Sequence, residues 1–259
     1  MSNLAATHKY KGQWIIAAQL AERSLALKRN KFGEQHLETL LAMEYLGTIY
    51  SHQGRLVEAV KLEKAVLNSR MRILGEGHLA TSRAMSNLGE MYHRQRRYAD
   101  AERLQHVVLN FRKELLGADH PDTLSAMSNL ACTYRAQGML DESRKLLESV
   151  VEIQVRVLGE EHYKRLQTMT NLAIVYLKQN CFAGSISLLK MSSIVMKRAL
   201  GEKHPDTLWT LRWLALAYRA SGRDRESTEL FREVLVARAE VLGQSHLYTV
   251  EVMNDLEQM

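Results

Sequence analysis

The chain of 259 residues repeats one motif at a fixed interval of 42 residues, and this repeat limits the possible folds more than any other feature. The motif is clearest at residues 115–134, which read LLGADHPDTLSAMSNLACTY. Three features of the motif recur at this interval through the chain. They are the Leu-Gly pair (Phe32-Gly33, Leu74-Gly75, Leu116-Gly117, Leu158-Gly159, Leu200-Gly201 and Leu242-Gly243), the histidine (His36, His78, His120, His162, His204 and His246) and the tyrosine (Tyr50, Tyr92, Tyr134, Tyr176 and Tyr218).

A period of this length is typical of a solenoid, in which a small unit cannot bury its apolar face alone and stacks on copies of itself. The repeat therefore predicts one elongated domain over residues 1–259 in place of one or two compact domains.

The apolar spacing within a unit is helical. Leu124, Met127, Leu130 and Tyr134 form one stripe, which predicts a first helix over about residues 121–136, here called the A helix. A second stripe after Gly138 predicts a longer B helix that ends at Leu158. With two prolines in the whole chain, the sequence predicts an all-α fold of helical hairpins.

Small residues recur where the two helices of a hairpin must approach closely. They are Gly47, Gly89, Ala131, Ala173 and Ala215 on A helices, and Ala17, Ala59, Ala101, Ser143, Ser185 and Ser227 on B helices.

The segment between hairpins carries helix-stop and helix-start signals. We expect Gly117 to take the left-handed conformation after one helix, and Pro121 to fit the first turn of the next. The histidine of each copy then lies at a helix start, which predicts a turn-capping role. The copies lie a full repeat apart, too far to share a metal ion.

Applied to the whole chain, the period predicts a partial A helix at 1–11, a B helix at 13–32, five A/B pairs over about 37–241 and a partial A helix at 247–259. The chain starts and stops inside a repeat, so its open ends are candidate surfaces for self-association.

The order Leu130-Ala131-x-x-Tyr134, Gly138, Ser143 and Leu147 resembles the tetratricopeptide repeat (TPR). Leu-Gly-x-x-His-Pro-Asp-Thr-Leu followed by Asn-Leu-Ala is similar to the 42-residue kinesin light chain variety, which also occurs in fungal and bacterial nucleotide-binding sensor proteins. The resemblance implies a right-handed α-solenoid whose A helices line the concave face.

Composition excludes several other classes. No apolar run is long enough for a membrane span, and the N-terminus has no signal-peptide pattern, so we expect a cytoplasmic protein. The net charge of +6 favours acidic partners and does not indicate nucleic-acid binding. Cys132 and Cys181 fit neither a disulfide framework nor a zinc site, and we find no catalytic or cofactor motif.

Two repeats depart from the pattern. One has Tyr163-Lys164-Arg165 at the A-helix start and Gly184 near the B-helix start, and another has Arg96 in place of the turn glycine. Each departure predicts either a local weak point or a surface that a partner uses.

Candidate binding residues follow from the positions of the A helix outside its packed stripe. Asn87, Asn129 and Asn171 share one such position, and an asparagine amide can pair with the backbone of an extended peptide. The alternative is that each asparagine ties its helix to the neighbouring repeat. On the same face we place the cations Arg83, Arg94, Arg135, Lys178, Arg212 and Arg219, together with Trp209 and Trp213. For either tryptophan, the alternative is packing against the next repeat.

The sequence therefore predicts a protein-interaction scaffold that binds an extended acidic peptide in the concave groove. One alternative is the recognition arm of a larger NTPase sensor protein. Another is an enzyme with its active site in the groove, although no motif supports it.

Overall fold

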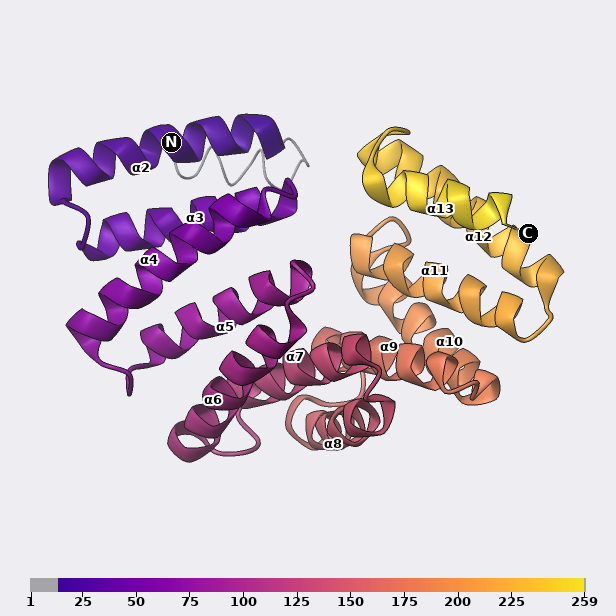
Figure 1. Ribbon diagram of the computed structural model, residues 1–259. Coiled ribbons are helices and arrows are strands. Elements are labelled where there is room, and N and C mark those ends of the chain that lie inside the picture. Colours follow the sequence, from indigo (N-terminus) through magenta and orange to yellow (C-terminus); the bar gives the residue numbers. More distant parts are fainter. Residues whose placement is uncertain (1–13, 259) are drawn as a thin grey trace. The chain divides into compact units, whose positions relative to one another are not determined.

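The computed structural model describes residues 14–258, and within them every regular element is an α-helix (Figure 1). The predicted helix at 1–11 lies outside the described residues. The chain divides into two compact units, 1–133 and 134–259, with the boundary inside one helix, and each is described by itself. The continuity of all repeats as a single array stays a prediction.

The N-terminal unit consists of antiparallel helices that pack on their sequence neighbours (Figure 1). They are α2 (Trp14–Phe32), α3 (Leu37–His52), α4 (Leu56–Leu74), α5 (Leu79–Arg94), α6 (Tyr98–Leu116) and α7 (Pro121–Gln137), which contains the unit boundary.

The C-terminal unit repeats this arrangement with α8 (Leu140–Leu158), α9 (Tyr163–Lys178), α10 (Phe182–Leu200), α11 (Pro205–Ala220), α12 (Asp224–Leu242) and α13 (Leu247–Glu257). The A helix predicted over about 121–136 is observed at Pro121–Gln137, and the B helix predicted to end at Leu158 ends there. Odd-numbered helices are A helices and even-numbered helices are B helices.

The small residues lie where the sequence placed them. Ala59 and Ala101 on B helices are fully buried, and a Cβ on Gly47 or Gly89 would meet the backbone oxygens of these same alanines at 3.7 and 3.8 Å. In the C-terminal unit Ser185 and Ser227 occupy the repeat position of Ala59 and Ala101, and their hydroxyls donate to the carbonyls of Ala173 and Ala215. A larger side chain at these positions would push the helices of a hairpin apart.

Each of the six histidines that recur once per repeat caps a helix. His120 Nδ1 accepts from Asp122 N–H at 3.1 Å, and the same contact recurs with His36, His78, His162, His204 and His246. The capping role is therefore confirmed.

The glycine before each turn differs from the prediction in one respect. Gly117 has the expected positive φ of 91°, but its ψ of 163° places it in an extended, glycine-only region and not in the left-handed helical region. An extended residue leads the chain away from the finished helix toward the next one. The Gly117 carbonyl accepts from Thr123 Oγ1 at 2.8 Å, which fastens the turn.

The tyrosine position is covered by a cation in three repeats. The guanidinium of Arg55 lies 3.8 Å from the Tyr50 ring centroid and pairs with Glu58 at 2.9 Å. Arg97 on Tyr92 and Arg223 on Tyr218 repeat the arrangement.

The repeat with Gly184 lacks this cation and its acid. Cys181 and Gly184 take their places, and a Cβ on Gly184 would lie 3.1 Å from the Tyr176 ring and 3.2 Å from Cys181 Sγ. The glycine therefore leaves room for the tyrosine to pack against the start of α10.

Candidate interaction face

Side chains join the A helices of successive repeats directly within each unit. In the N-terminal unit Arg94 Nη1 on α5 donates to Ser51 Oγ on α3 at 2.7 Å. In the C-terminal unit Gln167 Nε2 on α9 donates to Asp206 Oδ2 on α11 at 2.8 Å. The A helices of one unit thus present a connected surface, here called the A-helix face.

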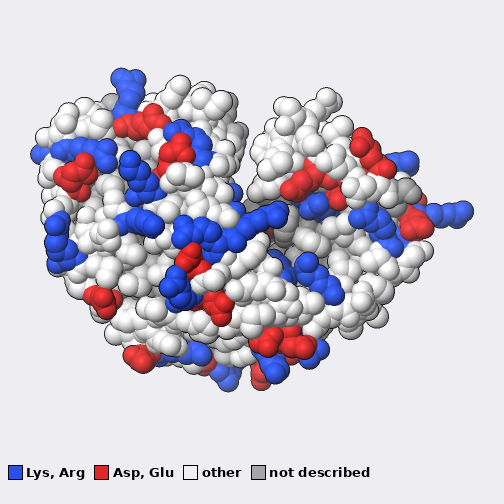
Figure 2. Space-filling model, in the orientation of Figure 1, with Lys and Arg blue, Asp and Glu red and all other residues white. Residues whose placement is uncertain are grey.

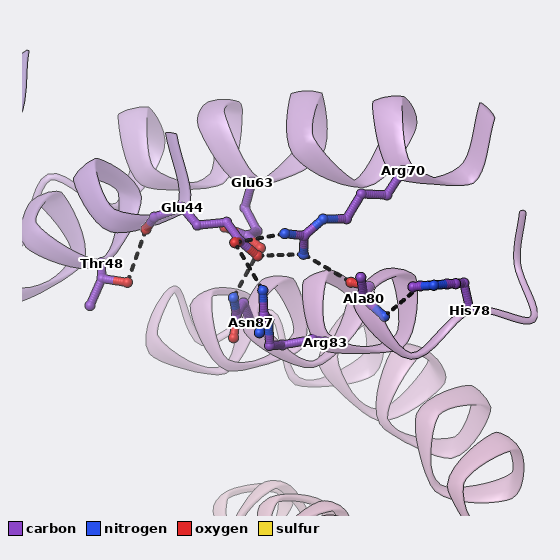
Figure 3. Close-up of polar contacts among 8 residues, drawn as sticks. All are labelled: Glu44, Thr48, Glu63, Arg70, His78, Ala80, Arg83 and Asn87. Carbon is purple, nitrogen blue, oxygen red and sulfur yellow. Dashed lines mark hydrogen bonds and ion pairs between the residues drawn. The ribbon is translucent and has the colours of Figure 1, made fainter. Parts of the chain in front are cut away.

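A polar cluster lies on this face in the N-terminal unit. Figure 3 shows Glu44 of α3 between Arg70 of α4 and Arg83 of α5. Arg70 is 1% exposed and binds both Glu44 carboxylate oxygens, at 2.6 and 2.8 Å, while Arg83 is more than half exposed and reaches Glu44 at 3.5 Å. Arg70 also donates to the Ala80 carbonyl at 2.9 Å, so this buried cation is both charge-paired and hydrogen-bonded.

Asn87 is fixed in the same cluster. Its amide donates to Glu63 Oε1 on α4 at 3.1 Å (Figure 3). Glu63 is fully buried, and burial together with the nearby charge of Glu44 raises the pKa of Glu63 to about 7. Asn87 therefore ties its helix to the neighbouring repeat, as the alternative interpretation states.

The C-terminal unit inverts the charges of the contact between A helices that Glu44 and Arg83 make in this cluster. Arg212 on α11 stands four repeats after Glu44, and Glu251 and Asp255 on α13 stand four repeats after Arg83 and Asn87. Arg212 Nε lies 2.6 Å from Asp255 Oδ2 and Nη1 lies 3.3 Å from Glu251 Oε2. The two clusters make the same contact between A helices with opposite charges.

Arg219 also serves as an internal link, because its Nη1 donates to the Asp255 carbonyl at 3.0 Å. Together with Arg94 and Arg212, it uses its charge mainly to hold neighbouring A helices. These three predicted peptide-binding cations have protein partners.

Four predicted binding residues are less engaged in contacts within the protein: Asn129, Asn171, Arg135 and Lys178. Among residues 14–258, the side-chain amides of Asn129 and Asn171 have no hydrogen-bond partner, although both residues are half-buried. Arg135 has a buried Nη1 without a hydrogen bond in the same part of the chain, and Lys178 is exposed.

The two tryptophans lie edge to face on α11, with ring centroids 5.8 Å apart. Trp213 packs against a core cluster that includes Tyr218 of its own helix and Leu189 of the preceding repeat. Trp209 instead lines a cavity beside α12 and α13.

Charge alone does not outline a binding strip. Figure 2 shows positive and negative side chains interspersed over the visible face of the N-terminal unit. Sequence reasoning did not find Glu63, Arg70 or Arg238, since these charges occupy packed positions of B helices where other copies carry Leu147, Gln154 or Met196. A charge within an apolar stripe was the available signal.

Other site classes have no support in the described region. Within residues 14–258, no three His, Cys, Asp or Glu side chains gather closely enough to hold a metal ion, and neither Cys132 nor Cys181 forms a disulfide. None of the helices described here has the length and apolarity that a bilayer crossing requires.

Hairpins of this kind, stacked on one another within each unit and with small residues between their helices, define an α-solenoid repeat scaffold. The sequence profile of the tetratricopeptide repeat matches residues 1–72, 46–111, 81–154, 134–193 and 166–239. The chain belongs to the tetratricopeptide repeat family. No curated protein sequence matches it.

Solved structures give the same assignment. A putative kinesin light chain from Podosopora anserina, built of TPR-like repeats that are nearly identical to one another, is 29% identical to this chain. The TM-score is 0.63, and the match covers 78% of this chain and 95% of that one. BtubC from P. vanneervenii shares the fold at 16% identity and a TM-score of 0.67, covering 87% and 91% of the two chains. A Rap protein complexed with Competence and Sporulation Factor shares it at 13% identity and a TM-score of 0.69, covering 86% of this chain and 65% of that one.

Proposed function

We propose that this repeat scaffold binds an extended acidic peptide along the A-helix face. The observation that carries the proposal is made in each unit separately, at Asn129 in the N-terminal unit and at Asn171 in the C-terminal unit. Their amides occupy one repeat position and, within residues 14–258, have no hydrogen-bond partner. An amide offers both a donor and an acceptor, so it can pair with a peptide backbone whatever the peptide sequence.

The charge of the peptide follows from the neighbouring cations. Lys178 is exposed, and Arg135 has a buried nitrogen without a hydrogen bond among the described residues. Each can form a charge-assisted hydrogen bond with a carboxylate. Arg83 is more than half exposed and contacts Glu44 only at 3.5 Å, which leaves it able to turn toward a ligand.

The comparisons support an interaction role. The kinesin light chain-type repeats are similar over most of their length, and the Rap structure holds a bound factor on the same fold. From the Rap complex we extend to this chain only the binding of a factor.

The proposal is tested with the intact chain on an array of extended peptides. Each acidic peptide is paired with a control in which Asp and Glu are replaced by Asn and Gln. We expect the acidic member to bind more tightly and its affinity to fall as salt rises. Equal binding of the two members at every salt concentration would contradict the proposal.

A further inference from the structure

One buried cation in the C-terminal unit lacks the counterion that its counterpart has. Arg238 on α12 is 3% exposed and stands four repeats after Arg70. Among residues 14–258, its hydrogen bond runs from Nη1 to the Tyr248 carbonyl at 2.6 Å, and its guanidinium lies 5.7 Å from the centroid of the Tyr248 ring. Within residues 14–258, no carboxylate forms an ion pair with Arg238, whereas Arg70 binds both oxygens of Glu44 (Figure 3).

The missing counterion follows from the inverted charge cluster. The position of Glu44 is occupied by Arg212, a second cation. The acids across from it, Glu251 and Asp255, bind Arg212. Burial and the positive charge of Arg212 lower the pKa of Arg238 to about 10, although Glu251 and Asp255 act in the opposite direction. A buried charge without a partner is costly.

Arg238 also lines a cavity of about 310 Å³ between α11, α12 and α13. The walls include the apolar side chains of Leu208, Trp209 and Leu242, and the Tyr248 side chain. Lys203 and Asp206 complete the polar part of the wall, but Lys203 pairs with Glu240 at 2.5 Å and Asp206 accepts from Gln167 at 2.8 Å. Arg238 is therefore the charge in this cavity that a ligand can neutralise.

We propose that this cavity binds a carboxylate with an apolar body, whose anionic group pairs with Arg238 and whose apolar part packs against Trp209 and Leu208. The volume fits a group of the size of one aromatic residue, at the lower end of ligand pockets. Such a carboxylate is either a free organic acid or the end of a peptide chain. The inference rests on Arg238 and not on the asparagines of the A-helix face, so the two proposals can fail separately.

The test uses calorimetric titration of the full chain with 3-phenylpropionate and with the neutral 3-phenylpropanamide. We expect the acid to bind and the amide to bind at least about 10-fold more weakly, as for the loss of one charge-assisted hydrogen bond. Equal binding of acid and amide, or no binding of the acid, would overturn the proposal.

Variants then assign the contact. Met196 stands at the position of Arg238 one repeat earlier, so Arg238→Met introduces a residue that this fold already accepts. We expect Arg238→Met to abolish the preference for the acid. Arg112→Met is the matched control, because Arg112 is a buried cation of the same repeat position that is held by Ser82 and Asp122. A folded Arg238→Met variant that still prefers the acid refutes the site.

A second variant supplies Arg238 with a counterion from the protein itself. Arg212→Glu combined with Glu251→Arg and Asp255→Asn reproduces Glu44, Arg83 and Asn87 of the N-terminal cluster and places a carboxylate near Arg238. We expect it to lose acid binding while it remains folded, and retained binding would count against the missing-counterion argument. Peptides that end in phenylalanine, with a free or an amidated C-terminus, distinguish the two sources of the carboxylate. If the ligand is the end of a peptide chain, the peptide with a free C-terminus should bind better than 3-phenylpropionate does.

Discussion

Arg212 and Asp255 join the last two A helices, α11 and α13, through a contact of 2.6 Å between Nε and Oδ2. Both side chains are largely buried, with exposures of 14% and 13%. Arg212 also pairs with Glu251 at 3.3 Å, and the same two repeat positions carry Glu44 and Arg83, 3.5 Å apart, in the N-terminal unit. A repeat can therefore keep its stacking contact while it reverses the charges that make it.

Arg212→Ala tests how strongly this contact holds α13. We expect a loss of about 2 kcal/mol in the free energy of unfolding, somewhat less than for a fully buried pair, because Asp255 and Glu251 are left without their cation. Urea unfolding measures the loss, and hydrogen exchange should rise first in α13. Lys203→Ala removes an exposed pair with Glu240 and should lower stability much less than Arg212→Ala does. Equal losses in both variants would show that Arg212 adds nothing beyond a surface charge.

Glu63→Gln tests the buried carboxyl. The folded-state pKa of Glu63 is raised from 4.5 to about 7, so the folded chain binds this proton more tightly than the unfolded chain does. The resulting stability is fully present below about pH 4.5 and is lost as the pH rises toward 7. Glutamine mimics the protonated acid, and Gln105 occupies the same position one repeat later.

We therefore expect Glu63→Gln to be more stable than the natural chain at pH 8, by up to about 3 kcal/mol, with the difference vanishing near pH 4. Urea unfolding over this pH range measures it. A difference that does not change with pH would contradict the raised pKa.

Arg96→Gly tests a strained turn. Arg96 has a φ of 60°, a left-handed conformation that costs a residue with a side chain more than it costs glycine. We expect a gain of about 0.5 to 1 kcal/mol in thermal or urea unfolding, reduced by the greater freedom of glycine in the unfolded chain. Asn180, with a φ of 59°, is the matched control. Asparagine tolerates this conformation, so Asn180→Gly should gain less; a larger gain at Asn180 would refute the strain argument.

His120→Ala tests the repeated cap. Loss of the acceptor for Asp122 N–H should cost about 1 kcal/mol, as for other N-caps. His120→Asn keeps an acceptor and should be nearly neutral. If both variants lose the same stability, the ring contributes by packing and not by capping.

The sequence period predicted the helices, the turns and the small contact residues because each depends on local chemistry that recurs once per repeat. Gly47 and Ala59, for example, can be paired from their positions alone. The partners of Arg94, Arg212 and Arg219 could not be predicted in this way, since each depends on a residue in the neighbouring repeat that varies between copies. Arg212 was predicted as a ligand contact, and its pairing with Asp255 became visible only when α11 and α13 were packed together. The role of Asn129 and Asn171 in binding stays a prediction.

Peptide binding along the A-helix face is the central claim, and one comparison of dissociation constants tests it most directly. The tightest acidic peptide is titrated into the natural chain, Asn129→Ala, Arg135→Glu and the B-helix control Arg225→Glu at low and high salt. We predict that Asn129→Ala costs about 1 to 2 kcal/mol of binding at both salt concentrations. Arg135→Glu should weaken binding mainly at low salt, and Arg225→Glu should leave it nearly unchanged. Equal affinity of all four folded proteins, or a loss confined to Arg225→Glu, would contradict the claim.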